Sequence, residues 1–324
     1  MSRLHEVVAP DGTRLCWWDN EITAGTPVVI SNGLGASPAA WPFLDAHAPG
    51  GRGYHAITWH HRGLGNSERP ADETRIGIAD HADDMVAVMD AAGVQRALVV
   101  GWSIGVGVAF EVVRRAPERV AGLLVLGGAA GGGFRVLPAQ TPAVLQRGLS
   151  RASAWLLRVV GPPVSGVISL LPKGLDALRA LDGGGTGTGA LMPAPVRTLG
   201  EVAREFARHD WTWFSRLVLA AGDHEAIPVD EVRVPVTVLA GEFDTLAPME
   251  EMAALAAGLP DARFVRLPGS HFLPLQYPEL LRAELDRLAA RARSSPGLVR
   301  TSGVRPGRRR PAGRARSPAP PHRR

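Results

Sequence analysis

Short apolar runs alternate with helix-length amphipathic segments over most of this chain, and this alternation restricts the fold more than any other feature. Eight runs have the length and composition of strands, at residues 3–8, 13–18, 27–31, 54–60, 96–101, 120–127, 235–241 and 262–267. Four segments have helical spacing, at residues 75–92, 103–116, 248–258 and 276–293. Strands that alternate with helices form a mostly parallel sheet with helices on its faces. The sequence therefore predicts an α/β fold built on an eight-stranded, mostly parallel sheet.

Two local patterns refine this prediction. The Pro-Asp-Gly turn at 10–12 separates the first two strands and predicts that they form an antiparallel hairpin. In the helix expected over 75–92, the apolar positions lie on one face, so Asp80, Asp83 and Asp84 are expected to point outward.

The alternation stops between the sixth and seventh predicted strands, at 120–127 and 235–241. Residues 129–230 contain glycine runs, several prolines and helix-like pieces around 142–160 and 198–220. We interpret this region as a helical cap inserted after strand 6. The predicted domains are a core over 1–128 and 231–293, a cap over 129–230, and a tail over 294–324.

The tail carries the basic charge of the chain. It contains nine arginines and no lysine or acidic residue, and subtracting nine from the net charge of +5 leaves −4 for residues 1–293. Its content of Pro, Gly and Ser predicts disorder, because such a segment cannot bury a core. The folded body is mildly acidic, so no specific nucleic-acid binding is expected from it.

Other features restrict the compartment. The N-terminus has no long apolar segment, so no secretory signal is expected. The apolar stretch 152–171 is broken by Arg158 and by the Gly-Pro-Pro at 161–163, which argues against a membrane span. The single cysteine, Cys16, excludes a disulfide framework and fits a cytoplasmic protein.

A serine lies at the junction of a predicted strand and a predicted helix. The stretch VVGWSIGVG at 99–107 places Ser103 in a Gly-x-Ser-x-Gly pattern, after the run 96–101 and before the helix that opens at 103. Small residues on both sides permit a sharp turn that exposes the serine hydroxyl at the sheet edge. In this context Ser103 is a candidate nucleophile.

A serine nucleophile needs a base, and the base needs an orienting acid. Asp244 follows the seventh strand and His271 follows the eighth. Parallel strands deliver their carboxyl ends to one edge of the sheet, so Ser103, Asp244 and His271 can converge. Glu242 remains an alternative acid in the same loop.

Four motifs together resemble the α/β-hydrolase superfamily over residues 3–293: NGLG at 32–35, HHRGLGNS at 60–67, GWSIG at 101–105, and the pair GEFD at 241–244 and GSH at 269–271. The resemblance implies that Ser103 is the nucleophile, His271 the general base and acid, and Asp244 its orienting residue. It also implies that the backbone N–H groups of Leu34 and Ile104 form the oxyanion hole.

The chain departs from the superfamily pattern at two places. Asn32 stands where many members have histidine, and hydrogen bonds from asparagine are expected to hold the loop equally well. His60 stands where many members have aspartate. The adjacent His60 and His61 either bind the substrate or are satisfied by loop carbonyls, and we favour the second interpretation.

A serine in this position implies an acyl-enzyme and therefore a carboxylic ester, lactone or thioester substrate. The apolar residues of 155–160, with Ile168, Leu170 and Leu171, predict a hydrophobic acyl pocket in the cap. Haloperoxidase-like perhydrolysis, enol-lactone hydrolysis and a non-catalytic ligand-binding role are the alternatives.

No cofactor and no metal are expected. The glycine run at 183–189 lacks the Lys-Ser/Thr of a phosphate loop. The His209-Asp210 pair and the acids and histidine at 223–225 lack further ligands at metal-binding spacing, so solvated surface or helix-end charge explains them better.

Overall fold

The computed structural model describes most of the predicted core and the end of the predicted cap. The described residues are 3–36, 38–44, 53–131, 159, 206 and 208–294. Most of the predicted cap, including the expected acyl-pocket segment except Val159, and the tail from 295 onward lie outside them. The apolar stretch 152–171 lies outside them as well, again except for Val159.

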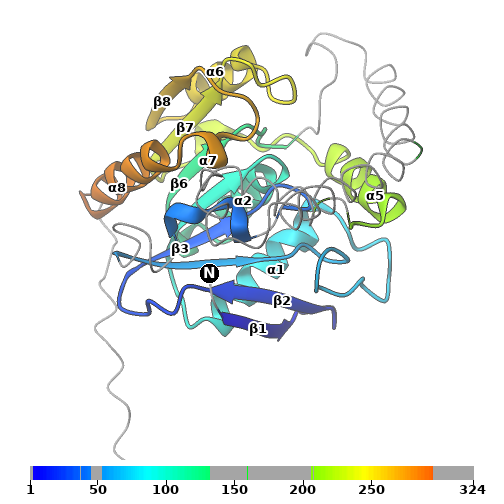
Figure 1. Ribbon diagram of the computed structural model, residues 1–324. Helices are drawn as coiled ribbons and strands as arrows, with labels where there is room; N and C mark the ends of the chain where they lie inside the picture. The colour runs from blue at the N-terminus through cyan, green and yellow to red at the C-terminus, as the bar shows by residue number, and fades with distance from the viewer. Residues whose placement is uncertain are drawn as a thin grey trace, which may run out of the picture.

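Eight strands form one sheet (Figure 1). They are β1 (Arg3–Val8), β2 (Arg14–Asp19), β3 (Thr26–Ser31), β4 (Tyr54–Trp59), β5 (Ala97–Trp102), β6 (Val120–Leu126), β7 (Val236–Gly241) and β8 (Ala262–Leu267). Their order across the sheet is β1-β2-β4-β3-β5-β6-β7-β8. β1 pairs with β2 and β2 pairs with β4 in antiparallel fashion, whereas all other pairs are parallel. The predicted sheet and its N-terminal hairpin are confirmed.

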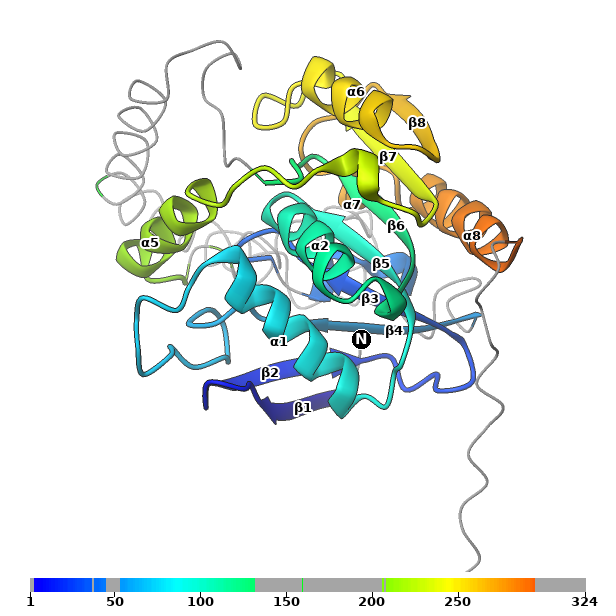
Figure 2. The ribbon, with the colours of Figure 1, turned by 180° about the vertical axis from the view of Figure 1, so that it is seen from behind.

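Helices cover both faces of the sheet. They are α1 (Ile78–Ala91), α2 (Ile104–Arg115), α5 (Trp211–Gly222), α6 (Met249–Gly258), α7 (Leu273–Gln276) and α8 (Pro278–Ser294). Viewed from behind, α1 and α2 lie in front of the central strands, while α8 lies on the opposite face (Figure 2). None of the helices in the described part of the chain is both long enough and apolar enough to cross a membrane.

The alternation of side chains along each strand builds two separate cores. Val29 and Val99 belong to the core under α1, α2 and α6, whereas their neighbours Val28, Leu98 and Val100 belong to the core under α8. This division follows from the two-residue period of a strand. Burial on both faces explains why these strands read as nearly continuous apolar runs.

The expectation that Asp84 points outward from α1 is wrong. Its side chain is fully buried, and both of its oxygens accept hydrogen bonds from Arg62, with Nε at 2.8 Å from Oδ2. Burial alone would raise the pKa of Asp84, but the Arg62 guanidinium holds that pKa below its usual range. Asp11 accepts another hydrogen bond from the same guanidinium at 2.7 Å. Helical periodicity could not reveal a partner that comes from a distant loop.

Candidate active site

Ser103 lies on a strained turn between β5 and α2. Its backbone has φ 57° and ψ −123°, in the left-handed half of the map that non-glycine residues rarely occupy. Its N–H donates to the carbonyl oxygen of Leu126 at 2.9 Å, which fixes the turn against the end of β6. The neighbouring Gly105 is required by close approach, because a Cβ there would lie 1.9 Å from the carbonyl oxygen of Ser31. The predicted strand–serine–helix junction is therefore present.

The loop after β3 lies against this turn. The N–H of Ala36 donates to the carbonyl oxygen of Gly33 at 3.0 Å, which closes a tight turn with Leu34 at one of its central positions. A Cβ on Gly33 would lie 3.4 Å from the Ser103 side chain. Among residues 3–36, 38–44, 53–131, 159, 206 and 208–294, no acceptor pairs with the backbone N–H of Leu34 or Ile104, and both residues are buried. Within these ranges, the loop after β3 and the start of α2 therefore each carry a backbone donor without a partner.

Asn32 fixes the start of this loop, as expected from the sequence. Its Nδ2 donates to Thr58 Oγ1 at 2.7 Å, and its Oδ1 accepts from the Trp41 indole. Thr58 in turn donates to the carbonyl oxygen of Ile30 at 3.0 Å. All these side chains are buried, so the bonds are protected from water. The participation of Trp41 and Thr58 has no signature in the sequence.

Of the two adjacent histidines, His61 bonds to a loop carbonyl as the sequence analysis favoured, whereas His60 accepts a hydrogen bond from a backbone N–H. His61 Nε2 lies 2.9 Å from the carbonyl oxygen of Asn32, and because that oxygen only accepts, Nε2 carries the proton. Burial, and next the neighbouring His81, lowers the pKa of His61 to about 3, so the ring is neutral. His60 Nδ1 accepts from the backbone N–H of Asn66 at 3.0 Å. His61 thus holds the loop after β3 through the carbonyl oxygen of Asn32.

Asp244 and His271 form a buried pair. His271 Nδ1 lies 2.9 Å from Asp244 Oδ2 and 3.1 Å from Oδ1. Asp244 Oδ1 also accepts from the N–H groups of Leu246 and Ala247, each at 2.9 Å, which fixes the carboxylate. Glu242, the alternative acid, instead pairs with Arg266 at 2.8 Å on the exposed side of the loop.

The three predicted residues lie at one edge of the sheet. Trp102 Nε1 donates to the carbonyl oxygen of His271 at 2.9 Å, so the residue before the serine binds the backbone of the histidine. A Cβ on Gly127, just after β6, would lie 2.9 Å from Asp244 Oδ2 and 3.1 Å from His271 Nδ1. Within the described part of the chain, however, the Ser103 hydroxyl makes no hydrogen bond. The structure pairs His271 with Asp244 and leaves Ser103 unpaired beside them.

The end of the predicted cap region contacts the core. His209 Nε2 lies 3.0 Å from the carbonyl oxygen of Gly35, so this half-exposed residue also contacts the core. Asp210 caps α5 by accepting from the N–H groups of Thr212 and Trp213, which is the expected helix-end role. Among the residues that the structure describes, no group of three or more His, Cys, Asp and Glu side chains could hold a metal ion.

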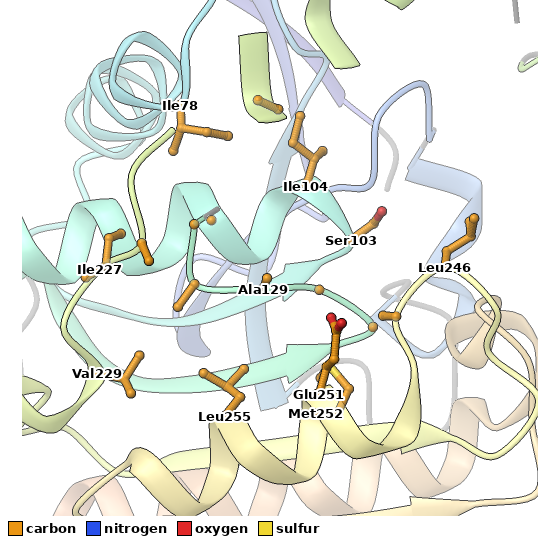
Figure 3. A pocket seen from close by; sticks show the side chains of 18 of the residues that line it. Ile78, Ser103, Ile104, Ala129, Ile227, Val229, Leu246, Glu251, Met252 and Leu255 are labelled. Carbon is orange, nitrogen blue, oxygen red and sulfur yellow. The ribbon is translucent and has the colours of Figure 1, made fainter. Parts of the chain in front are cut away.

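A cavity of about 360 Å³ opens beside Ser103 (Figure 3). It lies between α2, the segment after β6, the start of α6 and the segment after α5. Glu251, in the first turn of α6, lines it and was not identified from the sequence. No sequence motif marks this residue, because its placement depends on how α6 packs.

Comparisons with known proteins agree with the fold. Residues 26–163 match the protein family described as the alpha/beta hydrolase fold. RutD of Azorhizobium caulinodans, which is named as a carbamate hydrolase, is 29% identical over 81% of this chain and 90% of its own length. The rhodomycin D methylesterase DauP of Streptomyces sp. strain C5 is 28% identical over 81% of this chain and 90% of its own.

The fold is also found among solved structures. The enol-lactonase from Burkholderia xenovorans LB400 superposes with a TM-score of 0.65 and 20% identity, covering 88% of this chain and all of that one. The sheet order, the strand–serine–helix junction and the matched family agree with one another. The chain has the α/β-hydrolase fold, and its residues 26–163 match the family of that name.

Proposed function

We propose that this protein is a serine hydrolase that cleaves a carboxylic ester of a hydrophobic small molecule through an acyl-enzyme intermediate. The observation that carries this proposal is the strained position of Ser103 beside two unpaired backbone donors and the His271–Asp244 pair. Strain of this kind persists where the surrounding structure requires it, and it is concentrated at functional sites. The relatives RutD and DauP, by their names, act on carbamates and methyl esters, which share an acyl carbon with a heteroatom leaving group.

In this proposal Ser103 Oγ attacks the substrate carbonyl while His271 Nε2 takes its proton. Asp244 holds the proton on Nδ1, so that Nε2 is free to act as the base. The negative charge that develops on the carbonyl oxygen is bound by the N–H groups of Leu34 and Ile104. His271 then protonates the leaving alcohol, and water activated by the same histidine hydrolyses the acyl-enzyme.

A fluorophosphonate probe tests the proposal, because it reacts covalently with activated serines. We expect stoichiometric labelling of the intact protein and no labelling of Ser103→Ala. Hydrolysis of neutral aryl esters of increasing acyl length is measured beside it, and a preference for apolar chains of small to medium length is expected. Absent labelling, or equal labelling of Ser103→Ala, contradicts the proposed mechanism; a preference for short anionic acyl groups over apolar ones contradicts the proposed substrate.

A second prediction concerns the loop that carries Leu34. Asn32→Ala removes the side-chain acceptor of the Trp41 indole and one of the two hydrogen bonds of the Thr58 hydroxyl, which costs about 1–3 kcal/mol of stability. The loosened loop misplaces the Leu34 N–H, so we expect kcat to fall by about tenfold to a hundredfold, somewhat less than on loss of an oxyanion donor. KM should change little, since this N–H acts in the transition state.

Thr58→Val is the matched control for that variant. It removes the Asn32–Thr58 bond but keeps the side-chain shape and the Trp41 bond. We expect it to retain most of kcat. A folded Asn32→Ala protein with the wild-type kcat would show that this network does not position the loop.

A further inference from the structure

The cavity beside Ser103 has apolar walls with one exception. Apart from Ser103 and Glu251, every described residue that lines it is Gly, Ala, Val, Ile, Leu or Met. Ile78 and Ile227 form one end, and Leu246 lies near the serine (Figure 3). The volume of about 360 Å³ is in the usual range for small-molecule sites.

Glu251 directs its carboxylate from α6 into this cavity (Figure 3). Within the described ranges up to residue 294, no cation and no hydrogen-bond donor pairs with that carboxylate. Its neighbour Glu250 lies in the same first helical turn and is exposed to solvent. Both acids have a favourable position relative to the helix dipole, so the dipole does not explain why one of them faces the cavity.

Glu251 is half-buried, so its carboxylate keeps part of its hydration and gives up the rest to the apolar wall; a partner of opposite charge would compensate that loss. No basic side chain lines the cavity among the described residues. A cationic group on a bound small molecule would supply the missing partner, and an anionic group would be repelled. The walls and the carboxylate together fit an apolar chain that ends in a positive charge.

The position of the cavity also indicates which part of an ester it receives. It is lined by Ser103 and Ile104, beside which the acyl carbon and its oxygen would lie. His271, which would protonate the leaving alcohol, is not among the described residues that line the cavity. The alcohol must lie next to that histidine, so the cavity is left for the acyl group.

We propose that Glu251 is a specificity-determining residue that binds a cationic nitrogen in the acyl group of the substrate. This inference rests on the proposed function, since it takes Ser103 as the nucleophile. The expected substrates are esters of medium-length acids that carry an ammonium group at the end distant from the carbonyl.

Two p-nitrophenyl esters of the same shape test the inference. The 4-(trimethylammonio)butyrate ester carries a quaternary nitrogen where the 5,5-dimethylhexanoate ester carries a carbon. A carboxylate a few ångströms from the cation attracts it by an amount that supports a preference of about tenfold or more in kcat/KM. We expect this preference in the wild type, its loss in Glu251→Gln, and its retention in Glu250→Gln.

The ratio of the two ester rates is compared between the wild type and each variant, so differences in intrinsic ester reactivity cancel. Fluorophosphonate labelling of each variant reports whether Ser103 is still active. If Glu251→Gln does not fold, Glu251→Ala takes its place. Esters with the cation in the alcohol, choline butyrate against 3,3-dimethylbutyl butyrate, should show no Glu251-dependent preference.

Equal rates for the two acyl esters in the wild type, or a preference that survives in Glu251→Gln, would overturn the inference. Hydrolysis of the neutral ester and labelling of Ser103 would in that case still support the proposed function. A preference that depends on Glu251 but appears only in the choline pair would overturn the assignment to the acyl group. Absence of both hydrolysis and labelling would instead refute the proposed function itself.

Discussion

Substitution of Ser103 by alanine lowers kcat for every ester by about five to six orders of magnitude and leaves the protein folded. The reason is that the hydroxyl is the proposed nucleophile, and in serine hydrolases the remaining groups without it give only a small residual rate. The hydroxyl makes no hydrogen bond within the described residues, so its removal costs no stabilising contact. Ester hydrolysis at saturating substrate and circular dichroism of the same preparation check both parts.

Ser103→Gly is the matched control, because φ 57° with ψ −123° is unfavourable for any side chain but accessible to glycine. Relief of the strain stabilises the folded glycine variant by about 1–3 kcal/mol. The greater chain entropy of glycine in the unfolded state lowers that stability by about 0.5–1 kcal/mol. We therefore expect Ser103→Gly to be inactive yet more stable than Ser103→Ala by about 1 kcal/mol in urea unfolding. A less stable glycine variant would show that the turn is not strained.

Most of the core fold could be predicted from the sequence because both faces of the sheet are buried. The strand expected over 96–101 is observed as the fully buried Ala97–Trp102, and the helix expected over 248–258 begins one residue later, at Met249. Apolar runs and turn residues are local properties, and here the tertiary structure follows them. The order of the strands then brings the loops of Ser103, Asp244 and His271 to one edge, which the chain order of the motifs already indicated.

The parts that could not be predicted depend on contacts between distant segments. Asp84 reads as an exposed helical residue, and only the arrival of Arg62 from the loop after β4 explains its burial. The contact of His209 with the carbonyl oxygen of Gly35 likewise has no signature in the sequence. Glu250 and Glu251 are adjacent and chemically identical, and only the packing of α6 determines which of them faces the cavity. Composition and periodicity carry no information of this kind.

The second large effect is expected for Asp244→Asn, with a loss in kcat of about four orders of magnitude. In the present structure Oδ1 of Asp244 accepts from two backbone N–H groups, at Leu246 and Ala247, while Oδ2 faces His271 Nδ1. An asparagine must keep its oxygen toward those two donors, which turns its NH₂ group toward Nδ1. His271 is then forced to carry its proton on Nε2, where it cannot accept the proton of Ser103.

Glu242→Gln is the control for this assignment, since Glu242 is the other acid of the same loop and pairs with Arg266 away from His271. We expect it to retain kcat within about twofold, because surface ion pairs of this kind contribute little. Steady-state kinetics and the rate of fluorophosphonate labelling are measured for both variants, with thermal unfolding to compare their folds. Because asparagine preserves the shape and the two N–H contacts, a large loss of labelling rate with an unchanged unfolding temperature identifies a tautomer effect rather than a structural one. Loss of activity in Glu242→Gln with retention in Asp244→Asn would transfer the orienting role to Glu242.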